Sequence, residues 1–204
     1  MLSRWVRTWY GKFLRPSLLL LAKLGITPNM LTISSLVLTI ITGLALSQNL
    51  TVLGGILLLL GGILDAVDGE FARVTGHETK LGAFLDSICD HYGDFALSLG
   101  LLWLYLTNKS PTEVVLIVAA LFGSMLGSQV RSRAVMVGID IKDVGLITRF
   151  ERFLILIIGL FTHYILAALW VLAVLNNITA LQRIIHVFRV AHERHTAKLP
   201  PGAK

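Results

Sequence analysis

Apolar residues run along the chain in blocks long enough to cross a membrane. Residues 24–64 contain no charged side chain, and these 41 positions are too many for one span of about 20 residues but enough for two with a turn. The polar residues 47–49 predict the turn, which leaves one helix at about residues 30–46 and a second at about 51–71. Pro28, which suits a first helical turn, lies where the first helix begins.

Later blocks repeat this pattern. Helices are predicted at about residues 81–106 and 113–135, separated by the polar loop 107–112. Gly138 to Asp143 predicts the next loop. The last uncharged run, residues 153–182, fits either one long helix or parts of two with a turn near residues 161–163, and hydropathy alone does not choose between them.

The distribution of Lys and Arg residues favours six helices. With six, Lys109 alone among the 18 Lys and Arg residues lies on the outer side, in agreement with the positive-inside bias. Five helices would place a further basic group outside, namely Arg183, Arg189, Arg194, Lys198 and Lys204. The sequence therefore predicts an all-α integral membrane protein with six transmembrane helices and both termini in the cytoplasm.

The two ends of the chain have their own patterns. Residues 1–24 combine aromatic and basic side chains with an apolar run too short for a signal peptide, which predicts an amphipathic helix at the membrane interface. Residues 196–204, which include two prolines and a glycine, predict a flexible tail. Since no internal repeat is apparent, we treat residues 1–204 as a single membrane domain.

Composition supports the membrane class and limits the partners. Apolar residues make up 55% of the chain and charged residues 15%, whereas about 25% are charged in soluble proteins. The net charge of +6 comes from basic residues that flank apolar spans, so anionic lipid headgroups and phosphate-bearing substrates are favoured as partners over nucleic acid. A lone Cys89 excludes an internal disulfide and every Cys-based zinc site.

Acidic residues gather in one short segment. Seven of the 12 lie in the 30 positions from Asp65 to Asp94, inside or beside membrane helices, where an ionised carboxylate costs about 2.5–3.5 kcal/mol. Asp65 and Asp68 share one helical face, as do Asp86 and Asp90 on the next helix. A short connection makes these helices antiparallel neighbours, so the two pairs can meet near their cytoplasmic ends. Four oxygen ligands suit Mg²⁺ or Mn²⁺, as one ion or two.

The alternative is that these carboxylates form salt bridges with nearby basic residues, namely Arg73, His77 or Lys80. Salt bridges explain Glu70 and Glu78 as well as a metal role does. Four short aspartates at helical spacing, with Gly69 and Gly82 beside them, are better explained as a metal cage. The two glycines also fit plain helix packing, since small residues let membrane helices approach.

The same segment resembles the signature of the CDP-alcohol phosphotransferase family. It reads Asp65-Ala-Val-Asp68-Gly69-Glu-Phe-Ala72-Arg73, then eight residues, Gly82, three residues, Asp86, three residues and Asp90. The family's six-helix fold also matches the span count. The resemblance implies an enzyme of phospholipid biosynthesis with a cytoplasmic active site. Such an enzyme transfers a phosphatidyl-type group from a CDP-linked lipid to the hydroxyl of a second alcohol and releases CMP.

The family pattern implies roles for individual residues. Asp65, Asp68 and Asp86 would hold Mg²⁺ or Mn²⁺, with two ions expected, and Asp90 would be the general base and also touch a metal. Contacts with the CDP-lipid are implied for a larger set, Pro28, Asn29, Thr32, Gly69, Ala72, Arg73, Thr79 and Gly82. Gly69 would let the nucleotide approach the backbone closely.

Arginines near the predicted cytoplasmic helix ends indicate the acceptor. These arginines are Arg131, Arg133, Arg149 and Arg152, and they could serve simply as anchors that set the topology. A guanidinium also binds phosphate in a planar fork, however. A phosphorylated acceptor needs such a phosphate pocket beside the metals. Their segments are similar to those of the branch that uses inositol phosphate and makes phosphatidylinositol phosphate or its archaeal counterpart. That branch usually has Ala-Glu where this chain has Ala134-Val135. Glycerol 3-phosphate, which would give phosphatidylglycerol phosphate, is the alternative acceptor.

A cation- or proton-coupled transporter would also place carboxylates in membrane helices. It would predict charges near the bilayer midplane and often two related halves. Here the acidic residues form one contiguous cluster at a predicted cytoplasmic boundary, and no second half repeats it, so the enzyme interpretation is favoured. The sequence leaves open the acceptor alcohol, a diacylglycerol or archaeal lipid, the native metal and a homodimer.

Overall fold

The computed structural model describes residues 16–197, and every regular element in this range is helical. The predicted interfacial helix at residues 1–24 lies mostly outside the described range, although residues 16–23 are helical. The predicted tail also lies mostly outside it. Helix α7 ends at Ala197, two residues into that tail.

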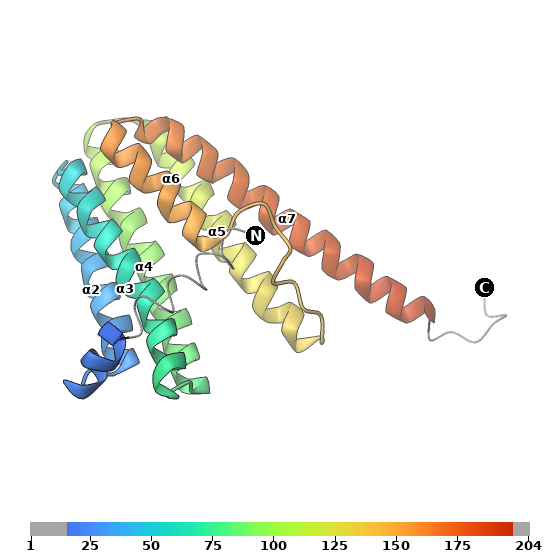
Figure 1. The fold of residues 1–204 in the computed structure, drawn as a ribbon. Coiled ribbons are helices and arrows are strands. Elements are labelled where there is room, and N and C mark those ends of the chain that lie inside the picture. Colours follow the sequence, from blue (N-terminus) through green and yellow to red (C-terminus); the bar gives the residue numbers. More distant parts are fainter. Residues whose placement is uncertain (1–15, 198–204) are drawn as a thin grey trace. The chain divides into compact units, whose positions relative to one another are not determined.

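Six long helices follow the short one (Figure 1). They are α2 (Pro28–Ser47), α3 (Thr51–Thr75), α4 (Lys80–Thr107), α5 (Pro111–Met136), α6 (Arg149–Thr162) and α7 (Ile165–Ala197). The four helices predicted upstream of residue 136 are confirmed. The last uncharged run forms parts of two helices, because His163 takes a left-handed conformation with φ of 60° and ends α6. The predicted turn near residues 161–163 is therefore confirmed.

Local chemistry sets where the helices begin and end. The Thr27 side chain accepts a hydrogen bond from the Met30 amide at 3.4 Å, and Pro28 occupies the first turn, so α2 begins two residues earlier than predicted. Thr148 and Glu151 form a capping box at the start of α6. Gly76, with φ of 70°, supplies the left-handed residue that ends α3.

Four helices are long and apolar enough to cross a membrane: Pro28–Ser47, Thr51–Thr75, Pro111–Met136 and Ile165–Arg194. By the same measure α4 and α6 do not qualify. Helix α4 carries several aspartates, and α6 has 14 residues. The protein is thus a helical membrane protein with four candidate spans among its described residues, and the six-span topology stays a prediction.

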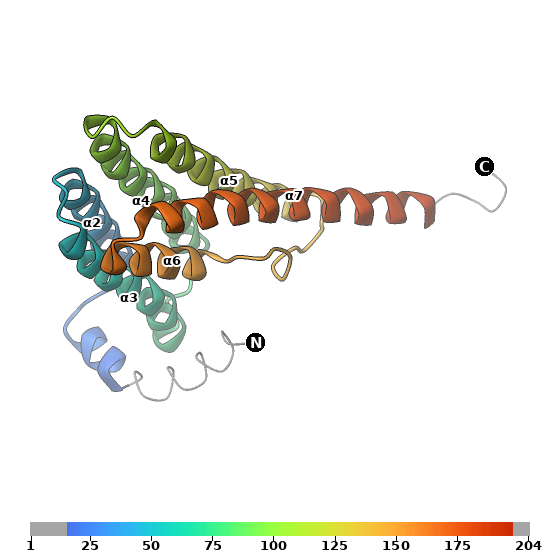
Figure 2. The same ribbon diagram turned by 90° about the horizontal axis from the view of Figure 1, so that it is seen from above.

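The chain divides into two compact units, residues 1–100 and 101–204, with the boundary inside α4. In the first unit α2 packs along α3, and α2 and α4 also lie side by side (Figure 2). The approach of α4 depends on glycine, because a methyl group on Gly43 would overlap the Ala96 carbonyl and one on Gly100 would overlap the Gly43 carbonyl. Small residues here allow backbone-to-backbone contact.

Helix α2 buries a row of hydroxyl side chains, Thr32, Ser35, Thr39 and Thr42. The Ser35 hydroxyl donates to the Gly61 carbonyl on α3 at 2.9 Å. The Thr39 side chain packs beside Gly93 of α4. Polar and small side chains on α2 therefore set its position along both neighbouring helices.

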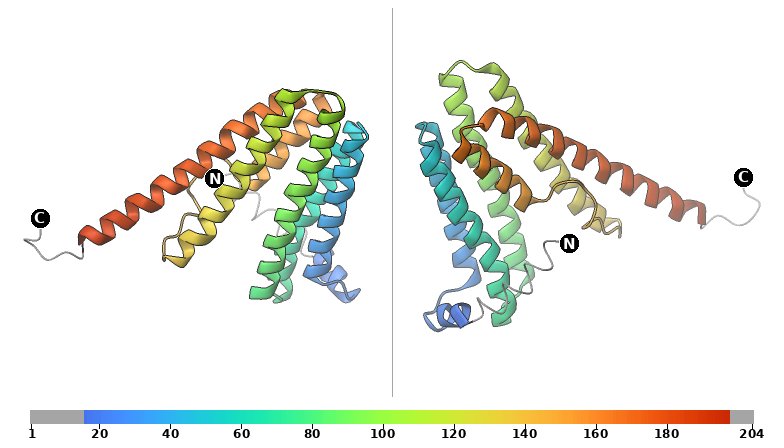
Figure 3. Two further views of the ribbon diagram at one scale, coloured as in Figure 1. Left: turned by 180° about the vertical axis from the view of Figure 1, so that it is seen from behind. Right: turned by 45° about the horizontal axis from the view of Figure 1, so that its top comes forward.

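In the second unit α7 packs against α5 and α6 (Figure 3). The side-chain amides of Asn176 and Asn177 donate to the carbonyls of Ala120 and Ala119, each at 2.9 Å. Gly123 makes this contact possible, because a Cβ atom there would lie 2.8 Å from the Asn177 backbone nitrogen.

Residues 137–148, which join α5 to α6, are held on α7. The Thr179 hydroxyl oxygen accepts from the amides of Leu146 and Ile147 at 3.2 and 3.3 Å. Both terminal nitrogens of Arg194 donate to the Gly138 carbonyl at 3.1 Å. The loop follows α7 through polar contacts on several of its turns.

Candidate metal centre

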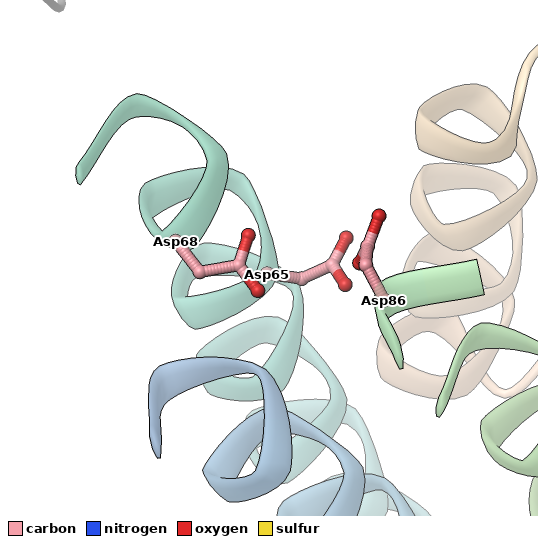
Figure 4. Close-up of side chains that lie close together, drawn as sticks. All are labelled: Asp65, Asp68 and Asp86. Carbon is pink, nitrogen blue, oxygen red and sulfur yellow. The ribbon is translucent and has the colours of Figure 1, made fainter. Parts of the chain in front are cut away.

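Three aspartates converge in the first unit. Asp65 and Asp68 of α3 and Asp86 of α4 each offer one carboxylate oxygen, and these oxygens lie within 4.8 Å of one another (Figure 4). Asp68 is buried and the other two are partly buried. Carboxylates this close repel one another unless a cation lies between them, and an all-oxygen set is what Mg²⁺ and Mn²⁺ prefer. The residues therefore fit the predicted divalent metal.

A tight helical hairpin brings these side chains together. Gly76 ends α3, and the Thr79 hydroxyl accepts from the Gly82 amide at 2.9 Å at the start of α4. The short connection makes α3 and α4 antiparallel, as the sequence predicts. Asp86 is thereby returned to the level of Asp65 and Asp68.

Thr32 contacts the metal centre directly. Its hydroxyl donates to Oδ2 of Asp68 at 2.6 Å, and both side chains are buried. The sequence predicts Thr32 as a contact of the CDP-lipid and gives no sign of this hydrogen bond, because the two residues are 36 positions apart.

Asp90 does not belong to the close group. It lies one helical turn after Asp86 on α4 and is partly buried. Among the described residues the group that could hold a metal consists of Asp65, Asp68 and Asp86. The predicted roles of Asp90 as base and metal ligand stay predictions.

The glycines beside the aspartates differ in their surroundings. Gly69 is exposed, and a Cβ atom there would meet nothing within 4 Å, so this position has no helix-packing role among the described residues. A Cβ atom on Gly82 would lie 3.1 Å from the Thr79 hydroxyl and 3.5 Å from Oδ1 of Asn29. Asn29, Thr79 and Gly82, which the sequence predicts as CDP-lipid contacts, thus lie together, with Pro28 next to Asn29 in the chain.

Arg73 pairs with Glu70 on the exposed side of α3. Its Nε and Nη2 donate to Oε2 of Glu70 at 3.1 and 2.7 Å. The salt-bridge interpretation of Glu70 is therefore confirmed. The exposed Arg73 and the partly buried Ala72 lie on the turn after Gly69.

The predicted acceptor arginines all lie in the second unit. Arg131 and Arg133 are exposed in the last turns of α5. Arg149 lies over the ring of Phe153, with 4.9 Å from its guanidinium carbon to the ring centre. Arg152 donates to the Ser124 hydroxyl of α5.

Arg183 belongs beside these arginines, although the sequence marks it only as one of the basic residues that favour six spans. It lies within electrostatic range of both Arg131 and Arg152. Its Nε donates to the Val144 carbonyl at 2.9 Å and its Nη1 to the Gly127 carbonyl at 3.0 Å. The sequence does carry a signal for Arg183, because this residue directly follows the last uncharged run, residues 153–182.

Similarity to known proteins extends over most of the chain. The family described as CDP-alcohol phosphatidyltransferase matches residues 25–192. Archaetidylinositol phosphate synthase of Pyrococcus horikoshii is 35% identical over 164 residues, which cover 80% of this chain and 85% of that protein. Phosphatidylinositol phosphate synthase of Mycolicibacterium smegmatis is 32% identical over 210 residues, covering 97% and 89% of the two chains.

Solved structures agree with these similarities. The crystal structure of Mycobacterium tuberculosis phosphatidylinositol phosphate synthase with CDP-DAG bound has a TM-score of 0.79 and 28% identity, covering 87% of this chain and 94% of that one. The same enzyme in complex with manganese and citrate has a TM-score of 0.78 and 28% identity, covering 85% and 88%.

Proposed function

The chain belongs to the CDP-alcohol phosphatidyltransferase family, and we propose that it transfers a phosphatidyl-type group from a CDP-linked lipid to inositol phosphate and releases CMP. The observation that carries this proposal is the group of Asp65, Asp68 and Asp86 within 4.8 Å, a set of ligands suited to a pyrophosphate-binding metal. The relatives named as inositol phosphate synthases support the choice of acceptor.

The three aspartates hold Mg²⁺ or Mn²⁺, and Asp90 completes the site when two ions bind. A related enzyme crystallised with manganese supports this assignment. The bound metal neutralises the charge of the CDP pyrophosphate. Gly69 leaves room for the nucleotide at the exposed side of α3. Arg73 moves from Glu70 to the pyrophosphate.

Asp90 takes the proton from the acceptor hydroxyl. The oxygen of that hydroxyl forms a bond to the lipid-linked phosphorus, and the bond from this phosphorus to the oxygen of CMP breaks. CMP leaves with the bonding electron pair, and the proton stays on the Asp90 carboxylate until it passes to water. A general base contributes about 10² to 10⁴ in rate.

Arginines bind the acceptor phosphate. Arg131, Arg133, Arg149 and Arg152 supply the guanidinium groups, and Arg183 adds a fifth close to Arg131 and Arg152. Like charges within electrostatic range of one another, as Arg183 is of Arg131 and Arg152, favour a bound anion, and Arg holds phosphate through paired N–H donors. The charge distribution supports a cytoplasmic site, because the basic residues are predicted to lie on that side of six spans.

The test is CMP release by purified protein in detergent. CDP-diacylglycerol and an archaeal ether-lipid analogue serve as donors, each with Mg²⁺ or Mn²⁺ and with inositol phosphate, glycerol 3-phosphate or free inositol as acceptor. We expect metal-dependent CMP release with inositol phosphate and none with free inositol. Turnover with glycerol 3-phosphate alone would assign the chain to phosphatidylglycerol phosphate synthesis instead.

A further inference from the structure

We propose that Thr32 is a positioning residue of the metal centre, whose hydroxyl fixes the orientation of the Asp68 carboxylate toward the metal. This inference rests on the proposed function, because it assumes that Asp68 is a ligand. It replaces the direct contact with the CDP-lipid that the sequence predicts for Thr32.

The geometry favours Asp68 over the other acceptor near the hydroxyl. Thr32 has one hydroxyl proton and two oxygens within reach, Oδ2 of Asp68 at 2.6 Å and the Pro28 carbonyl at 3.2 Å. A separation of 2.6 Å is typical of a hydroxyl that donates to an ionised carboxylate, and such bonds are stronger than those to neutral carbonyls. The proton therefore lies toward Asp68.

Burial makes this hydrogen bond consequential. Thr32 and Asp68 are each 6% exposed, so solvent cannot replace the hydroxyl as partner of the carboxylate. The Thr32 hydroxyl takes one lone pair of Oδ2, and the carboxylate keeps further lone pairs for a cation. Asp68 is thus held as a ligand with a fixed orientation.

Helix α2 also fixes the turn that carries Asp65. The Ser35 hydroxyl, one turn after Thr32, donates to the Gly61 carbonyl at 2.9 Å, and Gly61 lies four residues before Asp65. The positions of Asp65 and Asp68 along α3 therefore both depend on α2. Partners that orient metal ligands typically change metal affinity by about 10- to 100-fold when removed.

The experiment measures Mn²⁺ binding by purified protein without substrate, using the electron paramagnetic resonance signal of free Mn²⁺. Thr32→Val keeps the shape but removes the hydroxyl, and we expect its Kd for Mn²⁺ to rise by about 10- to 100-fold. Thr32→Ser should bind as wild type, because it restores the donor. Thr42→Val is the matched control, since the buried Thr42 hydroxyl donates within its own helix to the Leu38 carbonyl at 2.8 Å.

Two results would overturn the inference. One is an unchanged Kd for Mn²⁺ in Thr32→Val together with a raised KM for the CDP-lipid, which would return Thr32 to the nucleotide. The other is an equal loss of Mn²⁺ affinity in Thr42→Val, which would show a general packing effect. If Thr32→Val does not fold, Thr32→Ala is the second variant, with the same expected loss. Wild-type protein that binds Mn²⁺ but releases no CMP would refute the proposed function and leave the Thr32 result standing.

Discussion

Arg183 of α7 donates a hydrogen bond from Nη1 to the backbone carbonyl of Gly127 on α5, at 3.0 Å. Its Nε is engaged as well, by the Val144 carbonyl. The guanidinium is therefore held by two backbone groups while its charge lies near Arg131 and Arg152. A cation fixed in this way presents its remaining N–H donors in a constant direction, which suits a phosphate site.

Arg131→Ala and Arg152→Ala should each raise the KM for inositol phosphate by about tenfold or more, since a charge-assisted hydrogen bond is worth about 1.5–3 kcal/mol. The KM for the CDP-lipid should change little. Steady-state CMP release at varied acceptor concentration measures both values. Arg189→Ala is the control, because Arg189 is exposed and paired with Glu193 at 3.0 Å. If both variants keep the wild-type acceptor KM, these arginines are topology anchors.

Asp90→Asn should lower turnover by about 10² to 10⁴, because the amide cannot take the acceptor proton. Binding of a CDP-linked lipid should persist, since Asp65, Asp68 and Asp86 remain in place. Single-turnover CMP release and equilibrium binding of the donor lipid separate the two effects. Near-wild-type turnover would remove Asp90 from the role of base.

Six spans predict opposite sides for two exposed connections. In a Cys89→Ala background, Asn108→Cys between α4 and α5 should react with an impermeant thiol reagent in intact cells. His77→Cys between α3 and α4 should react only after the cells are opened. Both positions are exposed, so a difference in labelling reports their side of the membrane. External labelling of His77→Cys would reverse the predicted orientation.

Gly123→Ala should destabilise the second unit, because its Cβ atom would lie 2.8 Å from the backbone nitrogen of Asn177. Overpacking of this kind costs about 1–3 kcal/mol. Thermal unfolding in detergent measures the loss. Gly127→Ala is the matched control on the same helix, because its Cβ atom would lie 3.4 Å from the Arg183 Nη1, which is an ordinary van der Waals contact. Equal melting temperatures for the two variants would contradict this account of the α5–α7 contact.

Much of the helix order could be predicted from the sequence, because uncharged runs of known length and residues such as Pro28 mark where helices begin. The division of the uncharged run 153–182 near His163 could be predicted only from the distribution of Lys and Arg residues, because the apolar pattern continues through this point. The metal group was also predictable, because Asp65, Asp68 and Asp86 lie on facing sides of a short hairpin.

The contacts between distant helices were not predictable in this way. Helical periodicity shows which residues share a face, but it does not give the relative height of two helices. The bond from Thr32 to Asp68 and the place of Arg183 beside Arg131 both depend on that height. For the same reason the spacing of Asp86 and Asp90 does not reveal that the close group includes one and not the other.

The bonds from α7 to α5 also impose an order on biosynthesis. Asn176, Asn177 and Arg183 each reach carbonyls 56 or 58 residues earlier in the chain. At about 5–20 residues per second, a ribosome needs roughly 3 to 12 seconds to make that length. Throughout this interval the face of α5 around Gly123 has no α7 to cover it. A nascent chain that stops before Asn176 would therefore expose this face to insertion chaperones and membrane proteases.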